Sequence, residues 1–105
     1  MIAVQVTISS FTNESFPGWV ECWLEDAHGR WWKFNEKVAV VSTEALWTES
    51  EYPKPGAIAC TVLRRTADGS RRHVVTIDTE GVETVEGCAV FEVLAEQLEG
   101  DTVPN

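Results

Sequence analysis

The chain has few residues that could act as a catalytic base, a nucleophile or a metal ligand. His28 and His73 could serve as general bases only if the fold brought a nucleophile to them. His28 falls in a predicted turn, where a solvated side chain is the simpler interpretation. Cys22, Cys60 and Cys88 are widely spaced, and the chain contains no Cys-x-x-Cys, His-Glu-x-x-His or glycine-rich phosphate-binding motif. The sequence therefore predicts a non-enzymatic protein without a metal site or a cofactor.

One predicted strand pair gathers acids and aromatic rings on a single face. The members of this face are Trp19, Glu21, Trp23, Glu25, Trp31, Lys33 and Asn35. A glycosidase would need two carboxylates on either side of a cleft, and nothing in the sequence specifies a cleft between Glu21 and Glu25. The simpler interpretation is a solvated face on which Lys33 forms a cation–π contact with Trp23. If no other segment covers this face, its candidate binding residues are Trp19, Trp23, Trp31 and Lys33.

A second candidate is a cluster of positive charge around one predicted turn. The cluster consists of Arg64, Arg65, Arg71 and Arg72. From Asp78 to the last residue, by contrast, the chain has eight acids and no base. The arginines either extend into water or meet an anion, which could be the acidic segment of the same chain, a second copy or an outside phosphate. An exchange of these charges between two copies would form a homodimer.

Length and composition indicate one ordinary globular domain. The 105 residues, 44% of them apolar, are enough to bury a core without disulfides. The net charge of −9 disfavours a nucleic-acid binder, which needs a basic surface, and suits a protein with a basic partner. Five tryptophans are many for this length, and they indicate either an aromatic-rich core or a tryptophan-lined binding surface.

The cysteines and the lengths of the apolar segments indicate where in the cell the protein is located. The three cysteines lie between apolar neighbours and are odd in number, which indicates reduced thiols that behave as small apolar side chains. The first residues lack a basic segment followed by a long apolar run, and no later segment has 18 consecutive apolar residues. We therefore expect no signal peptide, no membrane span and a cytoplasmic protein.

Alternation of apolar and polar residues predicts a succession of strands. The clearest example is the first, in which Ile2, Val4, Val6 and Ile8 alternate with small or polar residues. The expected strands span residues 2–8, 19–25, 30–35, 37–41, 57–65, 71–78 and 88–98. The second half of the last segment could instead turn helical. Residues 42–47 could form one helical turn with Ser42 as its cap.

The adjacent tryptophans Trp31 and Trp32 must point to opposite faces of their strand. A three-residue loop over residues 27–29, with Gly29 in a left-handed conformation, would pair Leu24 with Trp32. A four-residue loop would instead mix polar and apolar residues on both faces. The three-residue loop therefore predicts that Trp32 faces the core and Trp31 faces outward. The predicted apolar face carries Val20, Cys22, Leu24, Trp32 and Phe34.

The register of the second hairpin depends on Asp68-Gly69, which predicts a two-residue type I′ turn. This turn would pair Val62 with Val75. It would also set Arg65 opposite Arg72, a pairing that like-charge repulsion opposes. The predicted inner face carries Ile58, Cys60, Val62, Val75 and Ile77.

Short strands with one apolar face favour an all-β domain. We predict a small, strongly bent β-barrel of about six or seven mostly antiparallel strands, because closure removes exposed strand edges. A two-sheet β-sandwich is the alternative. The single β domain is expected to span residues 1–99, followed by a flexible tail of residues 100–105.

Several short segments resemble a family of small bacterial proteins that has no assigned activity. These segments, within a resemblance covering roughly residues 11–98, are Phe16-Pro17-Gly18-Trp19-Val20, Gly29 with Trp31 or Trp32, Glu36-Lys37-Val38, and Tyr52-Pro53 with Pro55-Gly56. The resemblance implies a compact cytoplasmic bacterial domain and transfers no site residue. In size, charge and composition the chain is also similar to bacterial immunity proteins, which block a toxin partner.

The sequence thus favours a protein-interaction domain that binds a protein partner, or itself, through the tryptophan face or the opposed charges. An immunity-type inhibitor of a toxin and a small-ligand binder with a tryptophan-lined pocket are the alternatives. Neither nucleic acid nor a membrane is expected as a partner.

Overall fold

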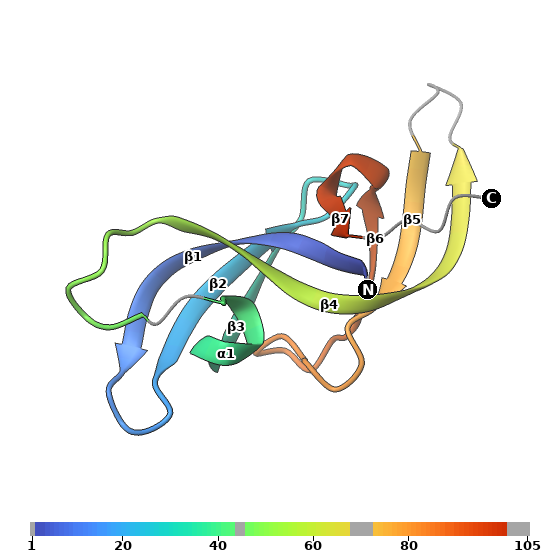
Figure 1. Cartoon of the computed structure of the whole chain (residues 1–105). Coiled ribbons are helices and arrows are strands. Elements are labelled where there is room, and N and C mark those ends of the chain that lie inside the picture. Colours follow the sequence, from blue (N-terminus) through green and yellow to red (C-terminus); the bar gives the residue numbers. More distant parts are fainter. Residues whose placement is uncertain (1, 44–45, 68–72, 101–105) are drawn as a thin grey trace.

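The computed structural model describes residues 2–43, 46–67 and 73–100, which form one antiparallel sheet. Its strands follow the order β3-β2-β1-β4-β5-β6, with β7 paired to β1. The sheet of seven strands curls through 283° into a half-barrel (Figure 1). The prediction of an all-β, strongly bent barrel is therefore confirmed over the two-sheet sandwich.

Strands make up most of the described chain, and two short helical turns interrupt them. The strands are β1 (Ile2–Asn13), β2 (Trp19–Glu25), β3 (Trp31–Lys37), β4 (Lys54–Ala67), β5 (His73–Asp78), β6 (Val90–Leu94) and β7 (Leu98–Gly100). The helical turns are α1 (Val38–Val41) and the 3-10 turn η1 (Ala95–Gln97). None of the helices in the described ranges has the length and apolar character needed to cross a membrane.

The first hairpin, β2–β3, has the predicted register and the predicted three-residue loop. Gly29 in this loop has a φ of +81°, the left-handed conformation that glycine adopts without strain. The Asp26 carboxylate holds the loop in place. It accepts hydrogen bonds from the backbone N–H groups of His28 at 2.9 Å and Arg30 at 3.0 Å, and from the Trp32 indole at 3.0 Å. Burial raises the pKa of Asp26, but these hydrogen bonds outweigh it and lower the pKa below its ordinary value.

The two adjacent tryptophans divide between the faces as predicted. Trp32 packs edge-on against Phe91 of β6, with 5.2 Å between ring centroids. The Arg30 guanidinium covers the same indole at 3.9 Å from the ring centroid, so Trp32 is half-buried at the border of the core. Trp31 faces outward and is 54% exposed.

The second hairpin, β4–β5, does not have the predicted register. Val62 pairs with Ile77 instead of Val75, and Arg65 pairs with Val75 instead of Arg72. The described pairing ends at Ala67 and His73. Arg65 therefore avoids the repulsive pairing with a second arginine that the predicted turn would have required. The predicted turn at Asp68-Gly69 lies outside the described residues.

This error left the predicted inner face largely intact. At Val62 the observed partner lies two residues beyond the predicted one. Because side chains in a strand alternate with a period of two, the same residues still face inward. Ile58, Val75 and Ile77 are fully buried, and Cys60 and Val62 pack against the core at its edge.

Two predictions for the middle of the chain need correction. Residues 37–41, predicted as a strand, contain the last residue of β3 and the helical turn α1. Both Val38 and Val41 are buried, which requires helical spacing because residues three apart lie on opposite faces of a strand. Ser42 follows α1 and donates its backbone N–H to the Val38 carbonyl at 3.0 Å, so it ends a helical turn instead of starting one. The expected turn over residues 42–47 falls partly outside the described residues.

The curl brings the edge strands β3 and β6 together around the core. Phe91 packs on Phe34 as well as on Trp32. Backbone hydrogen bonds run from Ala27 in the β2–β3 loop to the Glu92 carbonyl of β6 at 2.8 Å, and from Val85 in the β5–β6 connection to the Lys33 carbonyl of β3 at 2.9 Å. Such contacts protect strand edges that would otherwise be open to pairing. The core between them includes Val4, Val6, Ile8, Val20, Cys22, Leu24, Phe34, Val38, Val41, Leu46, Ile58, Val75, Ile77, Phe91 and Val93.

The close approach of α1 to β4 predicts a strict size limit at Gly56. A Cβ atom at this position would lie 2.8 Å from Ile8 Cδ1 and 2.8 Å from the Val41 carbonyl oxygen. We expect Gly56→Ala to lower the free energy of unfolding by about 1–3 kcal/mol, measured by urea denaturation. Ala59→Val, on the exposed face of the same strand, is the control and should change it by less than about 0.5 kcal/mol. Equal stability of Gly56→Ala and the parent would contradict this packing.

Candidate functional site

A groove opens on the outer face because β1 changes neighbour along one of its edges. The start of β1 pairs with β7 and its second half with β2, while β4 runs along the other edge. Gln5 and Val6 lie between the two segments, and within the described residues they have no strand partner on that edge. The turn η1 spans the gap, since Gln97 Nε2 donates a hydrogen bond to the Glu25 carbonyl oxygen at 2.7 Å. Gly100 ends β7 opposite Ile2, and the rest of the predicted tail lies outside the described residues.

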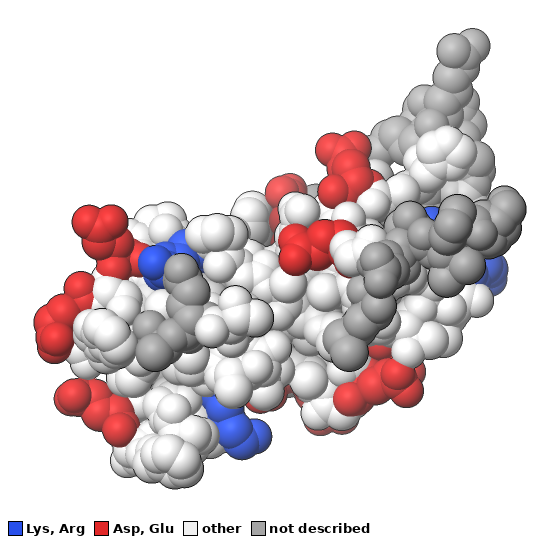
Figure 2. All heavy atoms as spheres, in the orientation of Figure 1, with Lys and Arg blue, Asp and Glu red and all other residues white. Residues whose placement is uncertain are grey.

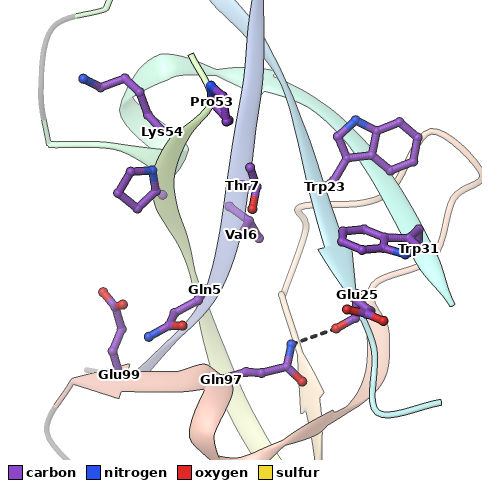
Figure 3. A pocket seen from close by; sticks show the side chains of 12 residues that line it. Gln5, Val6, Thr7, Trp23, Glu25, Trp31, Pro53, Lys54, Gln97 and Glu99 are labelled. Atoms are coloured by element: carbon purple, nitrogen blue, oxygen red, sulfur yellow. Dashed lines mark hydrogen bonds between the residues drawn. The ribbon is translucent and has the colours of Figure 1, made fainter. Parts of the chain in front are cut away.

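The groove has a volume of about 550 Å³. Its lining residues are Gln5, Val6, Thr7, Trp23, Glu25, Trp31, Pro53, Lys54, Pro55, Gly56, Gln97 and Glu99. Figure 3 shows Trp23 and Trp31 together on one wall, with Glu25 next to them. Pro53 and Lys54 lie across the groove, beyond β1. Of the predicted binding residues on the outer tryptophan face, Trp23 and Trp31 therefore line one wall of a groove, and Trp19 and Lys33 do not.

A network of polar contacts fixes the position of Trp23. Its indole N–H donates to Glu21 Oε2 at 3.0 Å, and the same oxygen accepts a hydrogen bond from Ser9 Oγ at 2.7 Å. Lys33 Nζ lies 3.7 Å from Glu21 Oε1 and 5.9 Å from the centroid of the Trp23 ring, which confirms the predicted cation–π contact. The hydrogen bonds from Ser9 and Trp23, helped by the charge of Lys33, lower the pKa of Glu21 despite its partial burial.

Trp31 differs from the other tryptophans of this face. Trp19 and Trp23 each lie under a lysine of the paired strand, Lys37 and Lys33, whereas the residue paired with Trp31 is Glu25. Within the described residues, no cation covers the Trp31 ring and its indole N–H has no hydrogen-bond acceptor. Trp31 is thus the aromatic side chain of the groove with the most freedom to contact another molecule. Trp19 lies outside the groove.

The predicted arginine cluster is only partly described. Arg64 lies 3.8 Å from Glu92 Oε2, so one of its neighbours is the acidic segment of the same chain. Glu92 also contacts the turn residue His28, with 2.6 Å between Oε1 and Nε2. Arg65 is exposed, and Arg71 and Arg72 lie outside the described residues. The structure therefore places Arg64 and Arg65 away from the groove, which neither of them lines.

The lining of the groove contains no histidine, serine or cysteine. Cys22 is fully buried, and burial, with the nearby charges of Glu36 and Glu21, raises the pKa of its thiol to about 12. Burial also raises the pKa of Cys60. Within the ranges that the structure describes, no three His, Cys, Asp or Glu side chains gather in a way that could hold a metal ion.

The sequence predicted the tryptophan wall of the groove but not its floor or its opposite side. Gln5 and Thr7 are polar residues that alternate with the apolar ones of the first strand, and no motif in the sequence marks them as part of a site. Gln97 and Glu99 reach the groove only because β7 pairs with β1, at the opposite end of the described chain. No local pattern specifies that pairing.

The network around Glu21 makes stability depend on pH. Its pKa is lower in the folded protein than its ordinary value of 4.5. The carboxylate therefore contributes its full stabilisation above pH 4.5 and loses it as the pH falls through the lowered pKa. We expect Glu21→Gln to cost about 1 kcal/mol at pH 7 and progressively less below pH 4.5, measured by urea denaturation. The matched control, Glu83→Gln at an exposed position, should cost less than about 0.5 kcal/mol. A cost for Glu21→Gln that stays constant with pH would contradict the assigned network.

Comparison with known proteins adds no relative. No protein-family model matches the chain, and no curated protein or solved structure matches it. The resemblance of residues 11–98 to small bacterial proteins therefore stays a prediction. The geometry and the charge of the groove are therefore the basis for assigning a function.

Proposed function

We propose that this chain is a non-enzymatic interaction domain that binds an extended segment of a partner protein in the groove between β2–β3 and the start of β4. One observation carries this proposal: Trp31, an aromatic side chain with 54% of its surface exposed, stands in the wall of a groove that also offers polar groups. Interfaces are commonly anchored by tryptophan side chains that fill or line such depressions.

The shape of the outer face suits an elongated ligand. A second hollow of about 580 Å³ shares Pro55, Gly56 and Glu99 with the groove and continues toward α1. In this hollow the sheet presents small side chains, since Ala3 pairs with Ala59 on the outer face. Together the two depressions form a track across β1 and β4, longer than a compact metabolite needs. An extended peptide lies in such tracks readily, because alternate side chains can enter successive depressions.

The polar groups of the groove supply both donors and acceptors for a peptide backbone. Gln5 and Thr7 lie along its length between the two walls, and Gln97 closes one end (Figure 3). Amide and hydroxyl side chains of this kind fix the orientation of a bound segment while the aromatic rings provide apolar contact. Binding of a protein segment thus uses every kind of side chain that lines the groove.

Two more specific forms of this function share the same surface. In self-association, the second copy would occupy the track, and in an immunity-type inhibitor the partner would be a toxin. The net charge of −9 favours a basic toxin as the partner and opposes self-association, because a second copy carries the same charge. Figure 2 shows acidic groups on many parts of the face in view and basic groups on few.

A small-ligand binder is the second candidate, and the volume of the groove favours it. Pockets for small molecules typically measure about 300–1,000 Å³, and the groove has about 550 Å³. Here the occupant would be a compact molecule that stacks on Trp23 and Trp31 without entering the second hollow.

The interaction function predicts that retention of a partner depends on Trp31. Immobilised parent protein, Trp31→Ser and Trp47→Ser would be exposed to extract from cells that produce this protein, and bound proteins quantified. Trp47 is the matched control because it is also 54% exposed and lies outside the groove. We expect at least one protein to bind the parent and the Trp47 variant, and to bind Trp31→Ser about tenfold less. The same set of proteins on all three baits would contradict the proposal.

The small-ligand alternative predicts a change in tryptophan fluorescence. A metabolite bound on Trp23 and Trp31 would shift the emission of the parent and of Trp47→Phe, but not that of Trp31→Leu. Emission that stays constant across a broad metabolite panel would exclude this alternative. The interaction function would be unaffected by that outcome, because it rests on the retention experiment.

A further inference from the structure

The outer face of the β2–β3 hairpin repeats one contact. Trp19 is paired with Lys37 and Trp23 with Lys33. The lysine ammonium groups lie 5.3 Å and 5.9 Å from the centroids of the respective rings. A cation over the face of an indole is attracted by the negative charge of the ring face. The hairpin therefore supplies each of these two tryptophans with its own cation.

The third tryptophan of the row lacks this partner. Trp31 is paired with Glu25, so a carboxylate stands where the pattern of the other pairs would place a lysine. Neither Glu25 nor Glu99 forms an ion pair with any residue in the described part of the chain, although both carboxylates line the groove. Glu25 lies next to Trp31, and Glu99 lies across the groove (Figure 3). The Trp31 side of the groove thus combines an open aromatic face with one unpaired carboxylate, and the opposite side carries a second.

The same chain shows how a guanidinium occupies such a place. Arg30 stacks on the Trp32 ring at 3.9 Å from its centroid and reaches Glu86, with 3.4 Å between Nη2 and Oε2. Arginine suits this combination better than lysine, because its planar group can stack on an indole while its N–H groups point to a carboxylate. The Trp31 side of the groove has the ring and the Glu25 carboxylate, and it lacks the cation.

On the basis of the proposed function, we infer that the partner segment inserts an arginine side chain at the Trp31 end of the groove. The guanidinium stacks on the Trp31 ring and pairs with Glu25. The residues flanking this arginine lie along Gln5 and Thr7 toward the second hollow. The net charge of −9 favours the approach of such a basic segment.

The test uses the whole chain labelled with 15N and the peptide acetyl-Ala-Ala-Arg-Ala-Ala-amide, with the tryptophan indole N–H signals followed by NMR. The matched probe carries citrulline, which keeps the shape of arginine without its charge. We expect the arginine peptide to shift the Trp31 signal saturably, to leave the Trp47 signal in place, and to bind at least about fivefold more tightly than the citrulline peptide. Added salt should weaken its binding.

Three variants assign the binding to the named groups. Trp31→Leu should weaken the arginine peptide about fivefold, and Trp31→Tyr, which keeps an aromatic face, should recover part of that loss. Glu25→Gln should weaken it about twofold to fivefold. Glu83→Gln changes the net charge equally outside the groove and should leave the affinity unchanged. An equal loss in Glu25→Gln and Glu83→Gln would overturn the assigned pairing, because only the overall charge would then matter.

The remaining outcomes separate this inference from the function on which it rests. Equal binding of the arginine and citrulline peptides would overturn the inference. Free N-acetyl-arginine-amide binding as tightly as the peptide would overturn its claim of an extended segment. If the arginine peptide fails to shift Trp31 while a partner is still retained through Trp31, the inference is wrong and the interaction function stands. If no protein is retained through Trp31, the interaction function itself is wrong.

Discussion

The hydrogen bonds of Asp26 determine which side of the first hairpin becomes core. This carboxylate accepts two backbone N–H groups of the turn and the indole N–H of Trp32. It thereby fixes the loop at three residues, and a change of one residue would exchange the faces of β3. Trp32 then meets Phe91 inside the curl, while Trp31 faces outward. Both the closure of the half-barrel and the wall of the groove follow from this single register.

A second constraint comes from the length and curvature of the sheet. β1 is long enough to serve two neighbours on one edge, and β2 diverges from it before β7 begins to pair. The place where neither strand pairs becomes the floor of the groove. Gln97 bridges this gap through a hydrogen bond to the Glu25 carbonyl, so the opening does not leave the sheet unsupported. The groove is therefore a direct result of how a curled sheet accommodates an extra short strand.

The tryptophan side chains of the outer face combine stability with availability for binding. Trp23 is held by Glu21 and covered by Lys33, so its indole is largely committed to contacts within the chain. Trp31 has no such contacts in the described residues and shares its cross-strand position with a carboxylate. These two tryptophans of the hairpin thus differ: Trp23 is held by contacts within the chain, and the Trp31 ring is open to another molecule. That contrast, more than the number of tryptophans, sets Trp31 apart as a place for an outside cation.

The sequence by itself determined the features that depend on local turn chemistry and on the alternation of apolar and polar residues along a strand. Alternation predicted the strands and the bent all-β fold, and the three-residue loop assigned Trp31 and Trp32 to their faces. The tertiary structure alone decided the register of β4–β5, the helical turn α1 and the pairing of β7 with β1. Each of these depends on contacts between residues far apart in the chain, such as the packing of α1 on Gly56 and the pairing of Leu98 with Val4. For the same reason only one wall of the groove could be predicted from the sequence, since Glu99 reaches the groove only when β7 pairs with β1.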